Sequence, residues 1–370
     1  MQRNFRSLGL ILLGVIAIQG SCSSPENPQE VFSKTKDKLF QAESISYSQV
    51  IFWENPSLGE VDTFRYESVF QPNPEAFFGY DFHGKRDKSE FWYLNQLALS
   101  VSHSDSSVVV MDQDQDLIQY NTYRSLGPLG LLMVGPWEYV KDSSIDGRIL
   151  KNYLWTEMDT LIDGKYVLLQ NHLFLNPANY LPEFYSRRLY HNGKRNQTID
   201  SHFSNYEFSS QKQLFKAKIP EGYVSKTMGE EGKGGAPLIQ VGAQAPDFKL
   251  KDLEGNWVQL SGLKGKKVLL DFSMINCGWC RIALEKFSQP DFQFSENIIP
   301  LYINPVDSEE KMDKYLSRNP IPFQVLWNAK EIGEKYGVNG YPTFVLIDEK
   351  GKVEEVTEGF NEENLTAWKK

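Results

Sequence analysis

The sequence predicts two regions of different fold class: an antiparallel, β-rich, half-barrel-like region over residues 30–224 and an α/β region over residues 241–370. In the first region, aromatic residues alternate with polar ones, as in half-buried strands. In the second, apolar runs typical of strands alternate with helical patterns. The stretch SKTMGEEGKGGAPLIQ at 225–240 predicts a linker between them. As a flexible coil it would span about 20 to 25 Å, so we expect two domains that can move relative to each other.

The first region should open with a helix at EVFSKTKDKLFQA, residues 30–42, where apolar side chains recur among lysines. Strands follow from residue 44 to about 224, as at Phe64, Tyr66 and Phe70, with Asp-Gly and Asn-Gly turn signals between them. The stretch SLGPLGLLMVGPWEYV at 125–140 is the expected internal helical piece, interrupted by prolines.

The second region should contain strands at 266–272, 297–303 and 343–348, with helices between them. This alternation predicts parallel strands joined by helical crossovers. Ligand chemistry in such folds gathers at the carboxyl ends of the strands. Cys277 follows the first of these strands closely.

The composition is that of a globular chain. Of the 370 residues, 41% are hydrophobic, which suffices for each region to bury a core. A net charge of −9 without a concentrated basic patch argues against nucleic acid as a partner. The only long apolar run is N-terminal, so we expect no internal transmembrane helix.

The N-terminal segment predicts export. Two arginines precede an apolar stretch at 8–18, which is too short to span a bilayer of about 30 Å. Small residues and Cys22 follow, and the segment resembles a bacterial lipoprotein signal, although Gln19 stands where an aliphatic residue is usual. Simple secretion and an uncleaved anchor helix are the alternatives.

The resemblance implies a signal peptide at 1–21, a lipid on Cys22 and a polar tether at 22–29. The lipid would anchor the protein in the bacterial cell envelope, at the outer membrane and facing the periplasm.

If Cys22 carries lipid, Cys277 and Cys280 are the only remaining pair of cysteines. With Cys277 capping a helix, both sulfurs would lie on one side of its first turn, close enough to bond. The positive end of the helix favours a thiolate at Cys277, while Cys280, one turn in, should be shielded. This asymmetry suits thiol–disulfide exchange, in which one thiolate attacks and the other resolves.

Two other uses of the pair fit less well. A structural zinc needs four ligands, but no third cysteine is free and all five histidines lie in the first region, so no metal is expected. A purely structural disulfide across two residues would stabilise the fold little, because the effect grows with the logarithm of loop length.

Three motifs together resemble the TlpA-type, thioredoxin-fold thiol-disulfide oxidoreductases of bacterial envelopes: GAQAPDFKLKDLEGNWVQLSGLKGKKVLLDF, CGWC and GVNGYPTFVLIDEKGKV. The resemblance covers residues 240–370. It implies a thioredoxin-like fold, Cys277 as nucleophile and Cys280 as resolving cysteine. It also implies that Pro342 is a cis-proline facing the pair and that Tyr341 offers its backbone to a substrate. Gly278 and Trp279 complete the expected substrate-binding set.

Asp271 interrupts the apolar strand six residues before Cys277, at the position of the buried aspartate in thioredoxin. Burial of a carboxylate raises its pKa, so Asp271 is a candidate to take the proton of Cys280 during resolution. The alternative is a polar residue near a strand end that faces solvent.

The predicted function is an envelope thiol-disulfide oxidoreductase that reduces protein disulfides without a cofactor. Its partners would be protein clients with thiols or disulfides and an unidentified envelope electron donor. A thiol peroxidase is one alternative, although LDFSMINC at 270–277 lacks the Pro and Thr of the peroxiredoxin pattern that it would have to resemble. Another is a lipoprotein that binds a hydrophobic ligand or a partner, because residues 173–208 resemble LolA-like carriers, whose concave aromatic face can hold acyl chains.

Overall fold

The computed structural model describes residues 26–112, 121–162, 164–210, 216–217, 219–227, 237–361, 365 and 367–370. The predicted signal peptide, Cys22 and most of the predicted linker lie outside the described residues. Within the described part, no helix is both long enough and apolar enough to cross a membrane.

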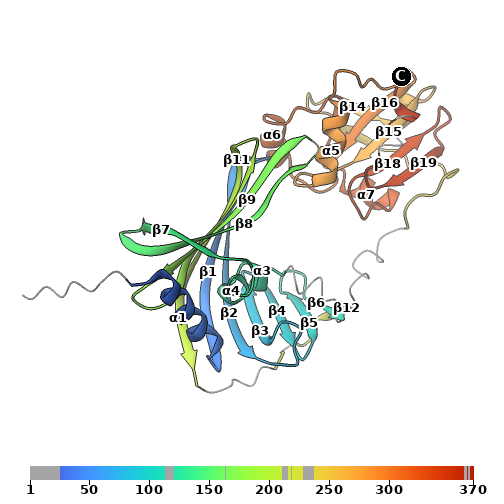
Figure 1. The fold of residues 1–370 in the computed structure, drawn as a ribbon. Coiled ribbons are helices and arrows are strands. Elements are labelled where there is room, and N and C mark those ends of the chain that lie inside the picture. Colours follow the sequence, from blue (N-terminus) through green and yellow to red (C-terminus); the bar gives the residue numbers. More distant parts are fainter. Residues whose placement is uncertain are drawn as a thin grey trace, which may run out of the picture.

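The N-terminal region forms one sheet of twelve strands (Figure 1). Its strands are β1 (Ser44–Asn55), β2 (Glu60–Pro72), β3 (Tyr80–Arg86), β4 (Ser89–Leu94), β5 (Leu97–Ser102), β6 (Ser107–Asp112), β7 (Glu138–Ile145), β8 (Arg148–Ile162), β9 (Lys165–Asn176), β10 (Leu181–His191), β11 (Lys194–Ser209) and β12 (Val224–Thr227). They lie in the order β12-β6-β5-β4-β3-β2-β1-β11-β10-β9-β8-β7. All neighbours are antiparallel except β12, which runs parallel to β6. The prediction of a β-rich region is therefore confirmed, and the sheet extends beyond residue 224 into the predicted linker.

Three helices pack on one face of this sheet: α1 (Pro28–Phe40), α3 (Thr122–Ser125) and α4 (Pro128–Met133) (Figure 1). The side chain of Asn27 caps α1, and Pro28 stands at its first position, where no backbone N–H is needed. The expected helical piece at 125–140 is wrong in extent. Gly127 is extended and separates two short helices, and the chain enters β7 at Glu138.

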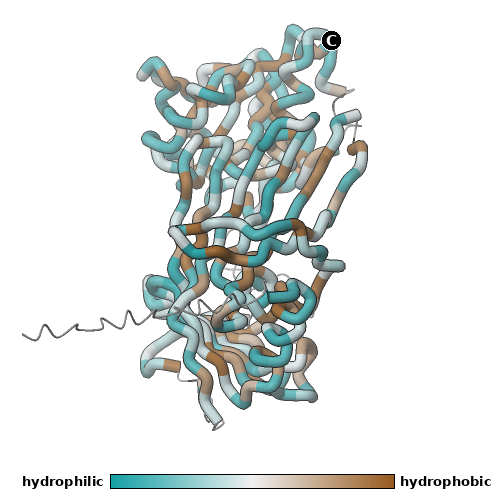
Figure 2. Tube along the Cα trace, turned by 60° about the vertical axis from the view of Figure 1, so that its left-hand side comes forward, coloured by the Kyte–Doolittle hydropathy of each residue, from teal (hydrophilic) through white to brown (hydrophobic). Residues whose placement is uncertain are grey.

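The face that carries the helices forms the core of the N-terminal region. Aromatic rings dominate it, such as Tyr47, Phe70 and Phe82, which pack together with Leu129 and Leu132 of α4. Figure 2 shows hydrophobic and hydrophilic residues alternating along these strands. Helical side chains thus fill the part of the concave face that the LolA resemblance would assign to a ligand.

The C-terminal region contains a five-stranded sheet with helices around it, together with a two-stranded sheet of β13 and β14 (Figure 1). Its elements are β13 (Lys249–Lys251), β14 (Trp257–Gln259), the 3-10 helix η1 (Leu260–Leu263), β15 (Lys267–Phe272), α5 (Gly278–Phe287), β16 (Ile298–Ile303), α6 (Glu309–Leu316), β17 (Gln324–Leu326), α7 (Lys330–Tyr336), β18 (Thr343–Ile347) and β19 (Val353–Glu358). The strand order is β17-β16-β15-β18-β19.

The predicted parallel strands make up only part of this sheet. β15, β16 and β17 are mutually parallel, whereas β18 runs antiparallel to β15 and to β19. A tight turn at Asp348 joins β18 to β19, and a turn this short can connect only antiparallel strands, which explains the direction of β19 relative to β18 but not that of β18 relative to β15.

The tip of the β1–β2 hairpin docks on the C-terminal region. Leu58 is only 6% exposed and belongs to the same buried cluster as Ile275 and Tyr315. Gly59 has a φ of 66°, a left-handed conformation that favours glycine, and the guanidinium of Arg318 packs directly against it.

Polar contacts surround this apolar contact. They are Lys314 Nζ to Glu60 Oε1 at 2.6 Å, Asn319 Nδ2 to the Ser57 carbonyl at 3.0 Å, and Lys165 Nζ to Glu285 Oε2 at 3.6 Å. The composition of the linker suggested two regions that move independently, whereas these contacts join them through side chains far apart in the sequence.

Candidate active site

The two cysteines lie where β15 leads into α5. Cys277 is the N-cap of α5, and the backbone N–H of Cys280 donates to its Sγ at 3.1 Å. The sulfurs form a disulfide, and the two Cα atoms are 5.2 Å apart. The helix thus begins at the position that the spacing of the pair predicted.

The two cysteines differ in exposure. Cys277 is half-buried, whereas Cys280 is 1% exposed. Between them, Gly278 is exposed and the Trp279 side chain is 62% exposed. A reagent from solvent therefore reaches Cys277 first, which is the asymmetry that stepwise disulfide exchange requires.

Tyr341 and Pro342 face the pair from the start of β18. The peptide bond between them is cis, and the carbonyl oxygen of Tyr341 lies 3.5 Å from Cys277 Sγ. The structure thus brings together two separate segments of the C-terminal region: the stretch from Cys277 to Cys280 and the backbone before Pro342.

Asp271 is buried, not solvent-facing. It is 1% exposed, Ser273 Oγ donates to its Oδ1 at 2.5 Å, and no described residue hydrogen-bonds its Oδ2. Burial raises the pKa of the Asp271 carboxyl to about 7, and the hydrogen bond from Ser273 opposes that rise. The alternative of a solvent-facing residue at the strand end is therefore wrong.

The alternation of β15 gives the direction of the Asp271 side chain. Leu269, two residues earlier on the same face, belongs to the cluster in which Ala283 and Leu284 of α5 are buried. Asp271 therefore lies beneath the helix that carries Cys280. A carboxyl that is half ionised near neutral pH in this position can exchange a proton with a buried thiol.

Asn304 and Asp307 hold the loop that precedes Cys277, and the sequence analysis missed both. The backbone N–H of Ile275 donates to Asp307 Oδ2 at 2.8 Å, and Asn304 Nδ2 donates to the same oxygen at 3.0 Å. A signal was available, because NPVD at 304–307 directly follows a predicted strand, at the edge of the sheet where such sites form.

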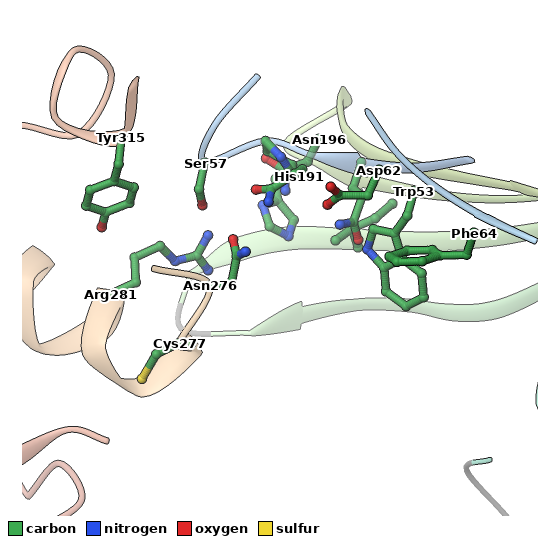
Figure 3. Close-up of a pocket in the computed structure, with 15 residues that line it drawn as sticks. Trp53, Ser57, Asp62, Phe64, His191, Asn196, Asn276, Cys277, Arg281 and Tyr315 are labelled. Atoms are coloured by element: carbon green, nitrogen blue, oxygen red, sulfur yellow. The ribbon is translucent and has the colours of Figure 1, made fainter. Parts of the chain in front are cut away.

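A pocket of about 630 Å³ opens beside Cys277, between the two regions (Figure 3). Its walls come from the β1–β2 and β10–β11 hairpins on one side and from the start of α5 on the other. The sequence offered no signal for this pocket, because its walls meet only through the docking of the two regions. Within the described residues, no group of three or more His, Cys, Asp or Glu side chains could hold a metal ion.

Comparison with known proteins identifies the class of the C-terminal region. Residues 241–356 match the family described as AhpC/TSA family. The chain is 34% identical over 125 residues to the thioredoxin-like protein YneN of Bacillus subtilis, which covers 33% of this chain and 73% of YneN. It is 31% identical over 124 residues to the thiol-disulfide oxidoreductase ResA of Geobacillus thermodenitrificans, covering 33% of this chain and 71% of ResA.

Among solved structures, the thioredoxin domain of a thiol-disulfide oxidoreductase from Bacteroides vulgatus aligns at 26% identity and a TM-score of 0.30, over 35% of this chain and 94% of its own.

The sequence relatives show that the C-terminal region has a thioredoxin-like fold and that the chain belongs to the thioredoxin-like thiol-disulfide oxidoreductases. The family match leaves residues 1–240 uncovered, so a LolA-like N-terminal region stays a prediction.

Proposed function

We propose that this protein reduces disulfide bonds of other proteins in the bacterial envelope, with Cys277 as the nucleophile and Cys280 as the resolving thiol. The observation that carries the proposal is the asymmetry of the pair at the start of α5: one sulfur is accessible at the N-cap, and the other is buried one turn further on.

The reaction runs in two exchange steps. The Cys277 thiolate attacks one sulfur of the client disulfide, which forms a mixed disulfide and releases the first client thiolate. The Cys280 thiolate then attacks Cys277 Sγ, which forms the intramolecular disulfide and releases the second client thiolate. Two electrons pass to the client, and a dithiol donor must later return two electrons to Cys277 and Cys280.

Asp271 supports the second step. A buried thiol such as Cys280 is a poor nucleophile until it loses its proton, and no bulk water is at hand to take it. Asp271, beneath the same helix and with a pKa of about 7, is the group we assign as proton acceptor.

Two sequence features support the direction and the location. Gly278 and Trp279 separate the cysteines, without the histidine found in strongly oxidising DsbA-type proteins, which favours the reducing direction. The apolar segment at 8–18 followed by Cys22 supports export and a lipid anchor at the outer membrane.

The test is to trap the intermediate. A Cys280→Ser variant should accumulate mixed disulfides between Cys277 and client proteins. These species should be visible on a nonreducing gel and should disappear when a dithiol reduces them. A Cys277→Ser variant is the matched control, because it keeps one thiol but lacks the accessible one. Equal trapping by both variants, or none by either, would contradict the proposal.

A measured reduction potential of the pair decides the direction. A value near that of thioredoxin, about −270 mV, would support a reductase, whereas a value near about −120 mV would indicate an oxidase.

A further inference from the structure

The pocket between the two regions has one wall on the N-terminal sheet and one wall on the helix of the cysteine pair. Trp53, Phe64 and Leu189 supply the apolar part of the sheet wall, and Asn276 and Arg281 belong to the facing wall. Cys277 and Gly278 are themselves among the lining residues, so the cavity is adjacent to the residue that carries the accessible sulfur.

The sheet wall continues the concave face that forms the N-terminal core. Trp53 follows Ile51, and Phe64 precedes Tyr66, at the two-residue spacing of strand positions that share a face. Ile51 and Tyr66 are buried within that core, whereas Trp53 and Phe64 are only half-buried and line the pocket. The concave face therefore has an accessible apolar surface at the end that meets α5.

The close-up shows the direction of the side chains on the wall formed by the start of α5. The side chains of Asn276 and Arg281 are directed toward Ser57 and His191 on the sheet side, while the sulfur of Cys277 points away from the pocket (Figure 3). The pocket therefore does not hold the bond that is broken. It lies on the other side of the loop from the sulfur, where residues adjacent to a client cysteine would pass.

The chemistry of the lining favours a polypeptide over an acyl chain. The side chains of Asn196 and Asn276 both donate and accept hydrogen bonds, as a peptide group requires. The charged groups of Asp62 and Arg281 would meet the hydrocarbon of an acyl chain without compensation. A volume of about 630 Å³ is within the range of pockets that enclose small ligands or a few side chains.

We propose that this pocket is a client subsite: an apolar side chain that flanks the client cysteine binds against Trp53 and Phe64, and its peptide groups bond to Asn276 on the facing wall. The inference rests on the proposed function and adds to it. It assigns to the N-terminal sheet a part in choosing which disulfides the C-terminal region reduces.

The test uses the full chain and two peptide disulfides. Each is a homodimer of a short blocked peptide with one cysteine, flanked by leucine in one peptide and by glycine in the other. We expect the wild type to reduce the leucine peptide with a kcat/KM about tenfold higher, since an apolar contact in a pocket discriminates by at least that much. Trp53→Ala should bring the ratio of the two kcat/KM values close to one.

Phe52→Ala is the matched control. Phe52 is the neighbour of Trp53 on β1 but points to the opposite face, is 37% exposed and packs against His202. This variant should keep the preference of the wild type. If Trp53→Ala does not fold, Phe64→Ala tests the same wall from β2.

The possible outcomes distinguish the proposed client subsite from the proposed reductase activity. A wild type that reduces both peptides equally well, or a Trp53→Ala variant that keeps the preference, overturns the subsite and leaves the reductase intact. A wild type that reduces neither peptide overturns the reductase and the subsite with it. A preference lost equally in Phe52→Ala would show a general effect on the sheet and would also overturn the subsite.

Discussion

The N-terminal sheet and the C-terminal region both bury polar groups, but only those of the C-terminal region lie beside a described cysteine. In the sheet, Gln49 Nε2 donates to the Leu126 carbonyl and the Tyr185 hydroxyl donates to Asn171, whereas Gln49 Oε1 and Asp200 Oδ1 have no hydrogen-bond partner among the described residues. In the C-terminal region, Asp271 is buried with one oxygen that no described residue bonds, directly beneath a reactive helix. Residues 30–224 also contain no cysteine.

This difference indicates which region carries the reactive groups. A buried carboxyl without full hydrogen bonding costs stability, and such groups cluster at functional sites. The described residues of the sheet include buried polar atoms without a partner but no cysteine, yet the sheet supplies one wall of the pocket beside Cys277. The reactive cysteines therefore lie in the C-terminal region, whereas both regions form the walls of the pocket beside Cys277.

The largest effect on activity is expected when the nucleophile is removed. Cys277→Ser should lower the rate of disulfide reduction by at least about 10³-fold, because the other cysteine of the pair, Cys280, is buried. The rate is measured with the glycine-flanked peptide disulfide. Substantial remaining activity would place the chemistry outside the pair.

The buried carboxyl should destabilise the C-terminal region at neutral pH. Its pKa is about 7 in the folded chain and about 3.9 in an unfolded one. Because the folded state holds the proton more tightly, the free energy of unfolding should fall as the pH rises from about 4 to about 7, by up to about 4 kcal/mol.

Asp271→Asn, which cannot ionise, should therefore be more stable than the wild type at pH 8 and equally stable at pH 4. Urea unfolding at both pH values measures this change. A variant less stable than the wild type at pH 8 would contradict this prediction, because it would mean that the surroundings stabilise the ionised form of Asp271.

The same substitution should slow the chemistry at one step only. Asp271→Asn should reduce the rate of mixed-disulfide resolution by about 10²-fold, because general-base help is lost. In the wild type this rate should rise with pH through about 7, the pKa of the carboxyl, and the variant should lack that rise. Stopped-flow kinetics measure the rate of mixed-disulfide resolution as a function of pH. The rate of Cys277 alkylation is the control and should be the same in the variant and the wild type.

The contact between the two regions should depend on Leu58. Leu58→Ala should reduce the free energy of unfolding by about 2 to 3 kcal/mol, since it removes a buried side chain from the cluster that contains Tyr315. Thermal unfolding measures the loss. Val61→Ala on the same hairpin is a control, because Val61 is 54% exposed.

The smallest effect should come from the exposed ion pair of Glu60 and Lys314. Glu60→Lys should shift the unfolding temperature too little to resolve, because exposed pairs contribute little to stability. A large shift that the Lys314→Glu exchange restored would mean that charge, rather than the apolar contact of Leu58, holds the two regions together.

Much of the C-terminal region could be predicted because its signals are local. The strand before Cys277, the helix that starts at the pair and the buried character of Asp271 follow from short stretches of sequence. The antiparallel β18 could not be read this way, since a strand has the same periodicity in either direction. Asn304 and Asp307 were missed because they act through space on the backbone of Ile275.

The class of chemistry follows from the sequence alone, because two cysteines three residues apart at a helix start define their own geometry. The surroundings of that pair arise from the tertiary contacts. The burial of Leu58, the place of Asp271 under α5 and the pocket between Trp53 and Asn276 all depend on contacts between segments far apart in the chain. Such contacts leave no periodic pattern, because each partner is selected by the shape that the rest of the fold presents to it.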